Sequence, residues 1–125
     1  MSRSRNTACP IALVDDDEET TALLKEFLES QGVKVECFRS AEKMLSAAPA
    51  RFGAIVLDIH LPGMWGSECG AELRGFGYKG PLIAITGNIE DWDPDDLRDL
   101  GFDHTLPKPF DPHSLVECVR KYAMV

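Results

Sequence analysis

The sequence has no long hydrophobic run, no signal-peptide pattern at its start, and fewer basic residues (13 Lys and Arg) than acidic ones (21 Asp and Glu). No apolar stretch approaches the roughly 20 residues that a transmembrane helix needs, so we expect no membrane insertion. The basic residues 1–8 are not followed by the apolar core of a signal peptide, and they predict a disordered tail. The net charge of −8 repels phosphates and argues against direct binding to nucleic acid or to acidic membranes.

The sequence also lacks a CxxC pair and a P-loop motif. Its four cysteines are scattered along the chain, at Cys9, Cys37, Cys69 and Cys118. This distribution predicts buried free thiols in a reducing compartment, and therefore a cytoplasmic protein.

What is present fits one soluble domain. The 125 residues are 44% hydrophobic and 27% charged, which is enough for a core without disulfides. We find no linker, no repeat and no low-complexity segment, so residues 9–125 are expected to form a single domain. The sequence does not decide whether this domain stands alone or is a part of a longer protein.

Strand and helix patterns alternate five times. Short apolar runs typical of strands lie at 10–14, 33–38, 54–57, 81–85 and 102–106. Five helical patterns lie between and after these runs. The first begins at Glu18 and stops at Gly32, the second runs from the N-cap Ser40 to Pro49, and the third covers 67–76. The fourth runs from Asp93-Pro94 to Gly101, and the fifth begins at Asp111-Pro112. This alternation predicts an α/β domain with a parallel sheet covered by helices on both faces.

Polar residues stand where these strands end. Asp15 and Asp16 follow the first strand, Asp58 the third, Thr86 the fourth and Lys108 the fifth. All these ends lie on one edge of a parallel sheet. If the strand order is 2-1-3-4-5, which we take from known folds, the first and third strands are neighbours about 4.8 Å apart and a crevice opens between them.

Three carboxylates this close repel one another, and a divalent cation relieves the repulsion. Oxygen ligands of this kind suit Mg²⁺, or Mn²⁺. With a cation bound, Asp58 can act as a carboxylate nucleophile toward a phosphoryl group. The hydroxyl of Thr86 and the ammonium of Lys108 would then stabilise the oxygens of the transferring group.

At these positions the sequence resembles the response-regulator receiver domain of two-component signalling. The similarity covers about Pro10 to Tyr122. It rests on Asp15-Asp16 after Leu13-Val14, on Asp58 within Leu57-Asp58-Ile59-His60-Leu61-Pro62-Gly63-Met64, on Thr86-Gly87, and on Lys108-Pro109-Phe110. The resemblance implies a (βα)5 flavodoxin-like receiver fold with a five-stranded parallel sheet of order 2-1-3-4-5.

The resemblance also implies roles for the polar residues. Asp58 would take a phosphoryl group from the phosphohistidine of a sensor histidine kinase or histidine phosphotransfer protein. Asp16, Asp58 and the backbone carbonyl of His60 would bind Mg²⁺, with Asp15 acting through water. Lys108 and Thr86 would bind the phosphoryl oxygens. The domain would then be a switch that assists its own phosphorylation and dephosphorylation, and not a metabolic enzyme.

The sequence departs from the family pattern at Thr105, which is preceded by His104. This position is often Tyr or Phe in the family and moves with the threonine, so the usual aromatic switch is in doubt. The resemblance also implies that His60 and Asn88 occupy two positions that tune phosphate lifetime in the family. The segment 91–96, with Trp92 and four aspartates, is also atypical.

Two other functions stay open at this point. A receiver-like interaction module that no longer uses phosphate would keep the fold without the chemistry. A flavodoxin-like cofactor carrier would need a glycine- and hydroxyl-rich phosphate loop, whereas three aspartates follow the first strand. The downstream protein is unknown from the sequence, and pairing of two copies of the chain is not decided by it.

Overall fold

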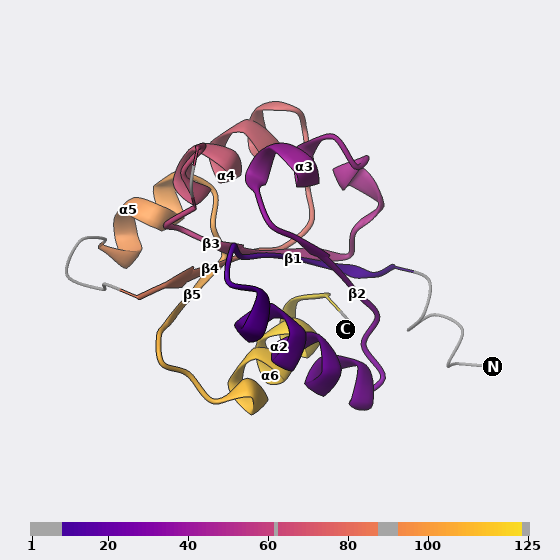
Figure 1. Cartoon of the computed structure of the whole chain (residues 1–125). Coiled ribbons are helices and arrows are strands. Elements are labelled where there is room, and N and C mark those ends of the chain that lie inside the picture. Colours follow the sequence, from indigo (N-terminus) through magenta and orange to yellow (C-terminus); the bar gives the residue numbers. More distant parts are fainter. Residues whose placement is uncertain (1–8, 62, 88–92, 124–125) are drawn as a thin grey trace.

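A computed structural model describes residues 9–61, 63–87 and 93–123 (Figure 1). The predicted tail 1–8 and the predicted features at Pro62, Asn88, Asp91 and Trp92 lie outside these residues. The strands are β1 (Ile11–Val14), β2 (Val35–Phe38), β3 (Ala54–Asp58), β4 (Leu82–Thr86) and β5 (His104–Pro107). The helices are α2 (Glu18–Ser30), α3 (Ala41–Leu45), the 3-10 helix η1 (Pro49–Arg51), α4 (Gly66–Gly75), α5 (Pro94–Asp99) and α6 (Pro112–Ala123).

The five strands form one parallel sheet of order β2-β1-β3-β4-β5. This confirms the predicted (βα)5 arrangement and the order 2-1-3-4-5. The register pairs Val14 of β1 with Leu57 of β3, and Asp58 of β3 with Ile85 of β4. The strand ends that carry the predicted site residues therefore meet at one edge of the sheet.

Helices cover both faces of the sheet (Figure 1). Helices α3, α4 and α5 lie on one face, and α2 and α6 lie on the other. Every residue of β1, β3 and β4 is buried, because these three strands are central and have helices on both sides. Alternate residues of a strand point into the hydrophobic cores on the two faces of the sheet. Ile55 and Leu57 pack on the α4 side, and Val56 packs on the α6 side.

Two strands, β2 and β5, start two residues later than predicted, because the first predicted residue of each belongs to a helix end. The backbone N–H of Val33 donates to Leu28 O at 3.0 Å, and that of Phe102 donates to Leu97 O at 3.1 Å. Both residues follow a glycine with positive φ, at Gly32 and Gly101. These bonds close α2 and α5 and delay the start of β2 and β5.

The predicted helix from Ser40 to Pro49 was wrong in its length. Ser40 does cap α3 by accepting the N–H of Lys43 at 3.2 Å, but the helix ends at Leu45. The backbone then passes through a left-handed conformation at Ala48, with φ of 55°. Pro49 begins a new 3-10 turn there, consistent with the preference of proline for the first helical position.

The prediction of four buried thiols was also wrong in part. All four cysteines are free, and Cys69 and Cys118 are buried, but Cys9 is exposed and Cys37 is half-buried. Cys9 precedes β1, outside the sheet, and Cys37 lies on the edge strand β2, which has a neighbour on one side only. In the described part of the chain, no helix combines the length and hydrophobicity of a membrane span.

Candidate functional site

Three carboxylates gather at the carboxyl edge of the sheet. Asp15, Asp16 and Asp58 each bring an oxygen atom to within 4.8 Å of the other two. We call this group the acidic cluster. Asp15 and Asp58 are buried, whereas Asp16 is exposed. The prediction that the ends of β1 and β3 bring these residues together is confirmed.

Asp58 is the last residue of β3, and only 4% of its surface is exposed. Its Oδ1 accepts the backbone N–H of His60 at 2.8 Å. Its Oδ2 accepts a hydrogen bond from Nζ of Lys108, also at 2.8 Å. Each carboxylate oxygen therefore has a donor, and the side chain is held in one orientation at the sheet edge.

Lys108 follows β5 and reaches over the end of the sheet to the acidic cluster. Its Nζ lies 2.8 Å from Asp58 Oδ2 and 3.4 Å from Asp15 Oδ2. Burial alone would lower the pKa of Lys108, but the hydrogen bond and charge of Asp58, with Asp15, raise it above its ordinary value. The lysine is thus held as a cation between two carboxylates.

Asp15 is almost fully buried at the end of β1, and its Oδ1 accepts the backbone N–H of Asp17 at 3.0 Å. Burial raises the pKa of the Asp15 carboxyl, and the charge of Asp58 adds to this increase. The Asp17 N–H and Lys108 act in the opposite direction. The net rise in the pKa of Asp15 is therefore mainly an effect of burial, which disfavours the charged form of the carboxyl.

Thr86 is fully buried at the end of β4. The register of β3 and β4 places it one residue beyond the partner of Asp58. Its carbonyl oxygen accepts the backbone N–H of Lys108 at 2.7 Å, which joins the ends of β4 and β5. The structure therefore brings Thr86 to the same edge as Asp58 and Lys108.

Among the other residues singled out by the sequence, His60 follows Asp58 by two positions, whereas His104 and Thr105 lie on β5. His60 is exposed, and its ring lies 5.3 Å from that of Trp65 at the start of α4. Thr105 is half-buried on β5 and pairs in register with Ala84. The neighbouring His104 contacts the ring of Tyr122 on α6, with a centroid distance of 5.9 Å.

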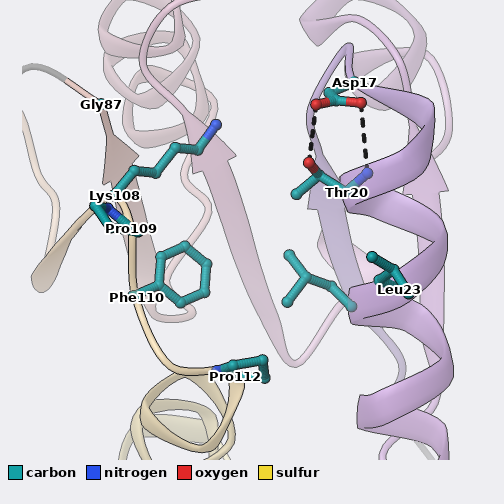
Figure 2. Close-up of a pocket in the computed structure, with 9 residues that line it drawn as sticks. Asp17, Thr20, Leu23, Gly87, Lys108, Pro109, Phe110 and Pro112 are labelled. Carbon is teal, nitrogen blue, oxygen red and sulfur yellow. Dashed lines mark hydrogen bonds between the residues drawn. The ribbon is translucent and has the colours of Figure 1, made fainter.

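A pocket of about 620 Å³ lies beside Lys108, between α2 and the segment that joins β5 to α6 (Figure 2). Its walls are mainly apolar, with Leu23 and Leu24 on the α2 side and Phe110 and Pro112 on the other. Leu23 is 68% exposed. An apolar surface thus adjoins the charged site.

Sequence reasoning missed two residues that support the site. Asp17 caps α2, a role that its place before Glu18 and Glu19 could have indicated. Gly66 begins α4 directly against the backbone of β3: a Cβ atom there would lie 2.2 Å from Asp58 O. No local pattern indicates this close approach, because it depends on how α4 packs on β3.

Comparisons with known proteins agree with this geometry. Residues 11–120 match the family model described as the response regulator receiver domain. The transcriptional regulatory protein CpxR of Klebsiella pneumoniae subsp. pneumoniae (strain HS11286) is 36% identical over 110 residues, or 88% of this chain and 47% of CpxR. The chain therefore spans about half the length of the curated relatives it matches.

Solved structures show the same fold. The BeF3-activated receiver domain of DrrB is 28% identical with a TM-score of 0.84, and the match covers 94% of this chain and 98% of that one. A CheY-like receiver domain protein from Methanospirillum hungatei JF-1 is 27% identical with a TM-score of 0.80, covering 90% and 91% of the two chains. Since the family model spans most of the chain and the acidic cluster stands at the expected strand ends, this chain belongs to the response regulator receiver domain family.

Proposed function

We propose that Asp58 accepts a phosphoryl group from a phosphohistidine and that the phosphorylated chain changes its binding to a downstream protein. The observation that carries this proposal is the contact of Lys108 Nζ with Asp58 Oδ2, at 2.8 Å, within the acidic cluster. A buried carboxylate beside a fixed cation is placed to react with an anionic group that would otherwise be repelled.

The acidic cluster has the composition of a site for Mg²⁺ or Mn²⁺. Three carboxylates face a single lysine among the charged groups described at this edge, so negative charge remains in excess. Asp16, Asp58 and the carbonyl of His60 would hold the ion, with Asp15 nearby through water. When bound, the ion would neutralise the carboxylates and the phosphoryl oxygens that meet there.

In the proposed transfer, an oxygen of Asp58 forms a bond to phosphorus as the phosphorus–nitrogen bond of the phosphohistidine breaks. The electron pair of that bond returns to the imidazole nitrogen of the donor. Lys108 and the hydroxyl of Thr86 stabilise the charge on the transferring oxygens. Water later cleaves the aspartyl phosphate. The chain is then its own substrate, so we infer a signalling switch in place of a metabolic enzyme.

The donor is proposed to be a sensor histidine kinase or a histidine phosphotransfer protein, which the chain would meet in the cytoplasm. The pocket beside Lys108 offers this protein an apolar surface next to the reacting group. The DrrB receiver domain, with 28% identity, was solved as a BeF3-activated form, which supports using beryllofluoride as a phosphoryl mimic here. A pulldown with and without beryllofluoride would identify the downstream partner.

The test is incubation of the chain with Mg²⁺ and acetyl phosphate, followed by intact mass measurement. We expect a gain of one phosphoryl group that is stable in acid and lost in base, and no gain after Mg²⁺ is removed with EDTA. Asp58→Asn should abolish the gain. Asp99→Asn, which changes an exposed carboxylate on α5, should not. A wild-type chain that gains no phosphoryl group, with its fold intact, would instead indicate an interaction module that does not use phosphate.

A further inference from the structure

The loop between β1 and α2 holds three successive aspartates, Asp15 to Asp17. The third has a different role from the first two. The carboxylate of Asp17 accepts the backbone N–H of Glu19 at 3.1 Å and of Thr20 at 3.4 Å through Oδ1. Its Oδ2 accepts the hydroxyl of Thr20 at 2.8 Å (Figure 2). Asp17 is therefore the N-cap of α2, and it is not a member of the acidic cluster.

The backbone of Asp17 is held on both sides as well. Its carbonyl oxygen accepts both the N–H and the hydroxyl of Thr21, at 3.0 and 2.5 Å. Its own N–H donates to Oδ1 of Asp15 at 3.0 Å. The cap of α2 thus continues, through one residue, into a hydrogen bond that orients a carboxylate of the acidic cluster.

Asp16 lies between two anchored residues. On one side, the N–H of Asp15 donates to Phe38 O at 3.0 Å, which ties the end of β1 to β2. On the other side, Asp17 is fixed by the first turn of α2. Asp16 itself is exposed. The place of its carboxylate beside Asp15 and Asp58 therefore depends on both anchors.

From this geometry we propose that Asp17 is a positioning residue that sets the affinity of the acidic cluster for a divalent cation. The proposal rests on the function proposed for Asp15, Asp16 and Asp58. Loss of the cap loosens the anchor at residue 17. Asp16 then has to be ordered when the ion binds, and this ordering weakens binding.

The experiment compares Mg²⁺ dissociation constants of full-length variants by tryptophan fluorescence at physiological ionic strength. Asp17→Ala removes cap and charge, and we expect about fivefold weaker binding, the factor that a typical cap contributes to a folding equilibrium. Asp17→Asn keeps a capping oxygen without the charge and should stay within about twofold of wild type. Asp93→Ala is the matched control, because Asp93 also caps a helix, α5, by accepting the N–H of Asp95, and lies outside the acidic cluster.

Asp17→Gly separates positioning from stability. Glycine is tolerated at N-caps at little cost, so this variant folds even if Asp17→Ala does not. It still lacks the side chain that binds Glu19 and Thr20, and it should bind Mg²⁺ about as weakly as Asp17→Ala. Phosphorylation of Asp17→Gly by acetyl phosphate should be slow at low Mg²⁺ and return to within about twofold of wild type at saturating Mg²⁺.

Other results would contradict either this inference or the proposed function. If Asp17→Asn binds Mg²⁺ as weakly as Asp17→Gly, charge and not the cap sets the affinity, and the inference is wrong. It is equally wrong if Asp17→Gly binds like wild type, or if its phosphorylation stays slow at saturating Mg²⁺. A wild-type chain that binds no Mg²⁺ would instead overturn the proposed function itself.

Discussion

Lys108 and Asp58 form an ion pair of 2.8 Å although 50 positions separate them in the sequence. The pair spans the ends of β3 and β5, with β4 between them. Only 6% of the Asp58 side chain is exposed, so its charge is balanced mainly by this lysine and by the His60 N–H. Any cation that binds the acidic cluster must share Asp58 with Lys108.

Replacing Lys108 should therefore separate cation binding from phosphoryl transfer. In Lys108→Met we expect Mg²⁺ to bind about fivefold more tightly, since removing a unit charge a few Å away is worth about 1 kcal/mol in water-like surroundings. The rate of phosphorylation at saturating Mg²⁺ should fall about 100-fold, because one stabiliser of the transferring oxygens is lost.

Fluorescence titration and phosphorylation kinetics measure these two effects. Lys79→Met, at an exposed lysine after α4, is the control and should change neither quantity. Unchanged Mg²⁺ affinity in Lys108→Met would contradict the idea that the lysine and the cation compete for the same carboxylates.

The apolar pocket predicts a variant that distinguishes protein donors from small donors. Leu23 is exposed on the wall of this pocket, so Leu23→Asp should leave the fold intact. We expect transfer from a phosphorylated histidine phosphotransfer protein to slow about tenfold, the cost of losing one good interface contact. Phosphorylation by acetyl phosphate should stay within about twofold of wild type.

The control for this comparison is Phe76→Asp. Phe76 is 71% exposed and lines a different pocket, beside Tyr78 at the end of α4. Phe76→Asp should leave the rate of phosphorylation by either donor unchanged. Equal slowing with both donors in Leu23→Asp would show that the pocket acts on the reaction, and not on docking.

Two glycines of α4 provide a further test of what holds Asp58 in place. A Cβ on Gly66 would lie 2.2 Å from Asp58 O and 2.8 Å from Ile59 Cα, both backbone atoms that cannot swing aside. Gly66→Ala should lower the free energy of unfolding by about 2 to 3 kcal/mol and reduce phosphorylation. At Gly75, the last residue of the helix, an added Cβ atom would meet no packed neighbour within 4 Å.

Gly75→Ala should therefore be neutral or stabilising by up to about 1 kcal/mol, since alanine favours the helix. Urea unfolding monitored by circular dichroism measures both changes. If the two variants were equally stable, the close approach of α4 to the acceptor strand would not constrain Asp58.

The stability of the domain should fall at alkaline pH, partly through Tyr78. This residue is 9% exposed and its hydroxyl donates to Phe52 O at 2.9 Å. Burial raises the pKa of Tyr78 to about 12 from an ordinary value of 10.0. Between these values the folded chain holds a proton that the unfolded chain has lost, so the free energy of unfolding decreases as pH rises.

Tyr78→Phe should be about 1 kcal/mol less stable near neutral pH, because the hydrogen bond to Phe52 is gone. Its further loss between pH 10 and 12 should be smaller than that of wild type. Burial also raises the pKa of Cys69 to about 12 and of Cys118 to about 11, so part of the alkaline loss remains. Unfolding curves at several pH values would show this, and parallel slopes in the two proteins would contradict it.

The secondary structure was largely predictable because its signals are local. The caps at Ser40 and Asp93 and the glycine that stops α2 follow from side-chain and backbone properties of single residues. The errors fell at element ends. Val33 is a residue type that favours strands, but its N–H donates to Leu28 O and closes α2. Local hydrophobicity carries no information about such a choice.

The candidate site was predictable only as a set of strand ends. The residues Asp15, Asp16, Asp58, Thr86 and Lys108 could be named because each follows an apolar run. Their meeting depended on a strand order taken from known folds, and the structure now shows that order for this chain. The link from the Asp17 cap to Asp15 needed the hydrogen bond itself, since the sequence does not show which atoms meet within the loop.

By itself, the sequence determined the alternation of strands and helices and the residue type at each strand end, because hydrophobic periodicity and capping act over a few residues. Only the tertiary structure decided that Lys108 pairs with Asp58 and that Gly66 packs directly against the acceptor strand. These contacts arise from the crossover connections and register of the sheet. Such connections bring together residues that are distant in sequence, and no local pattern records the distance between their atoms.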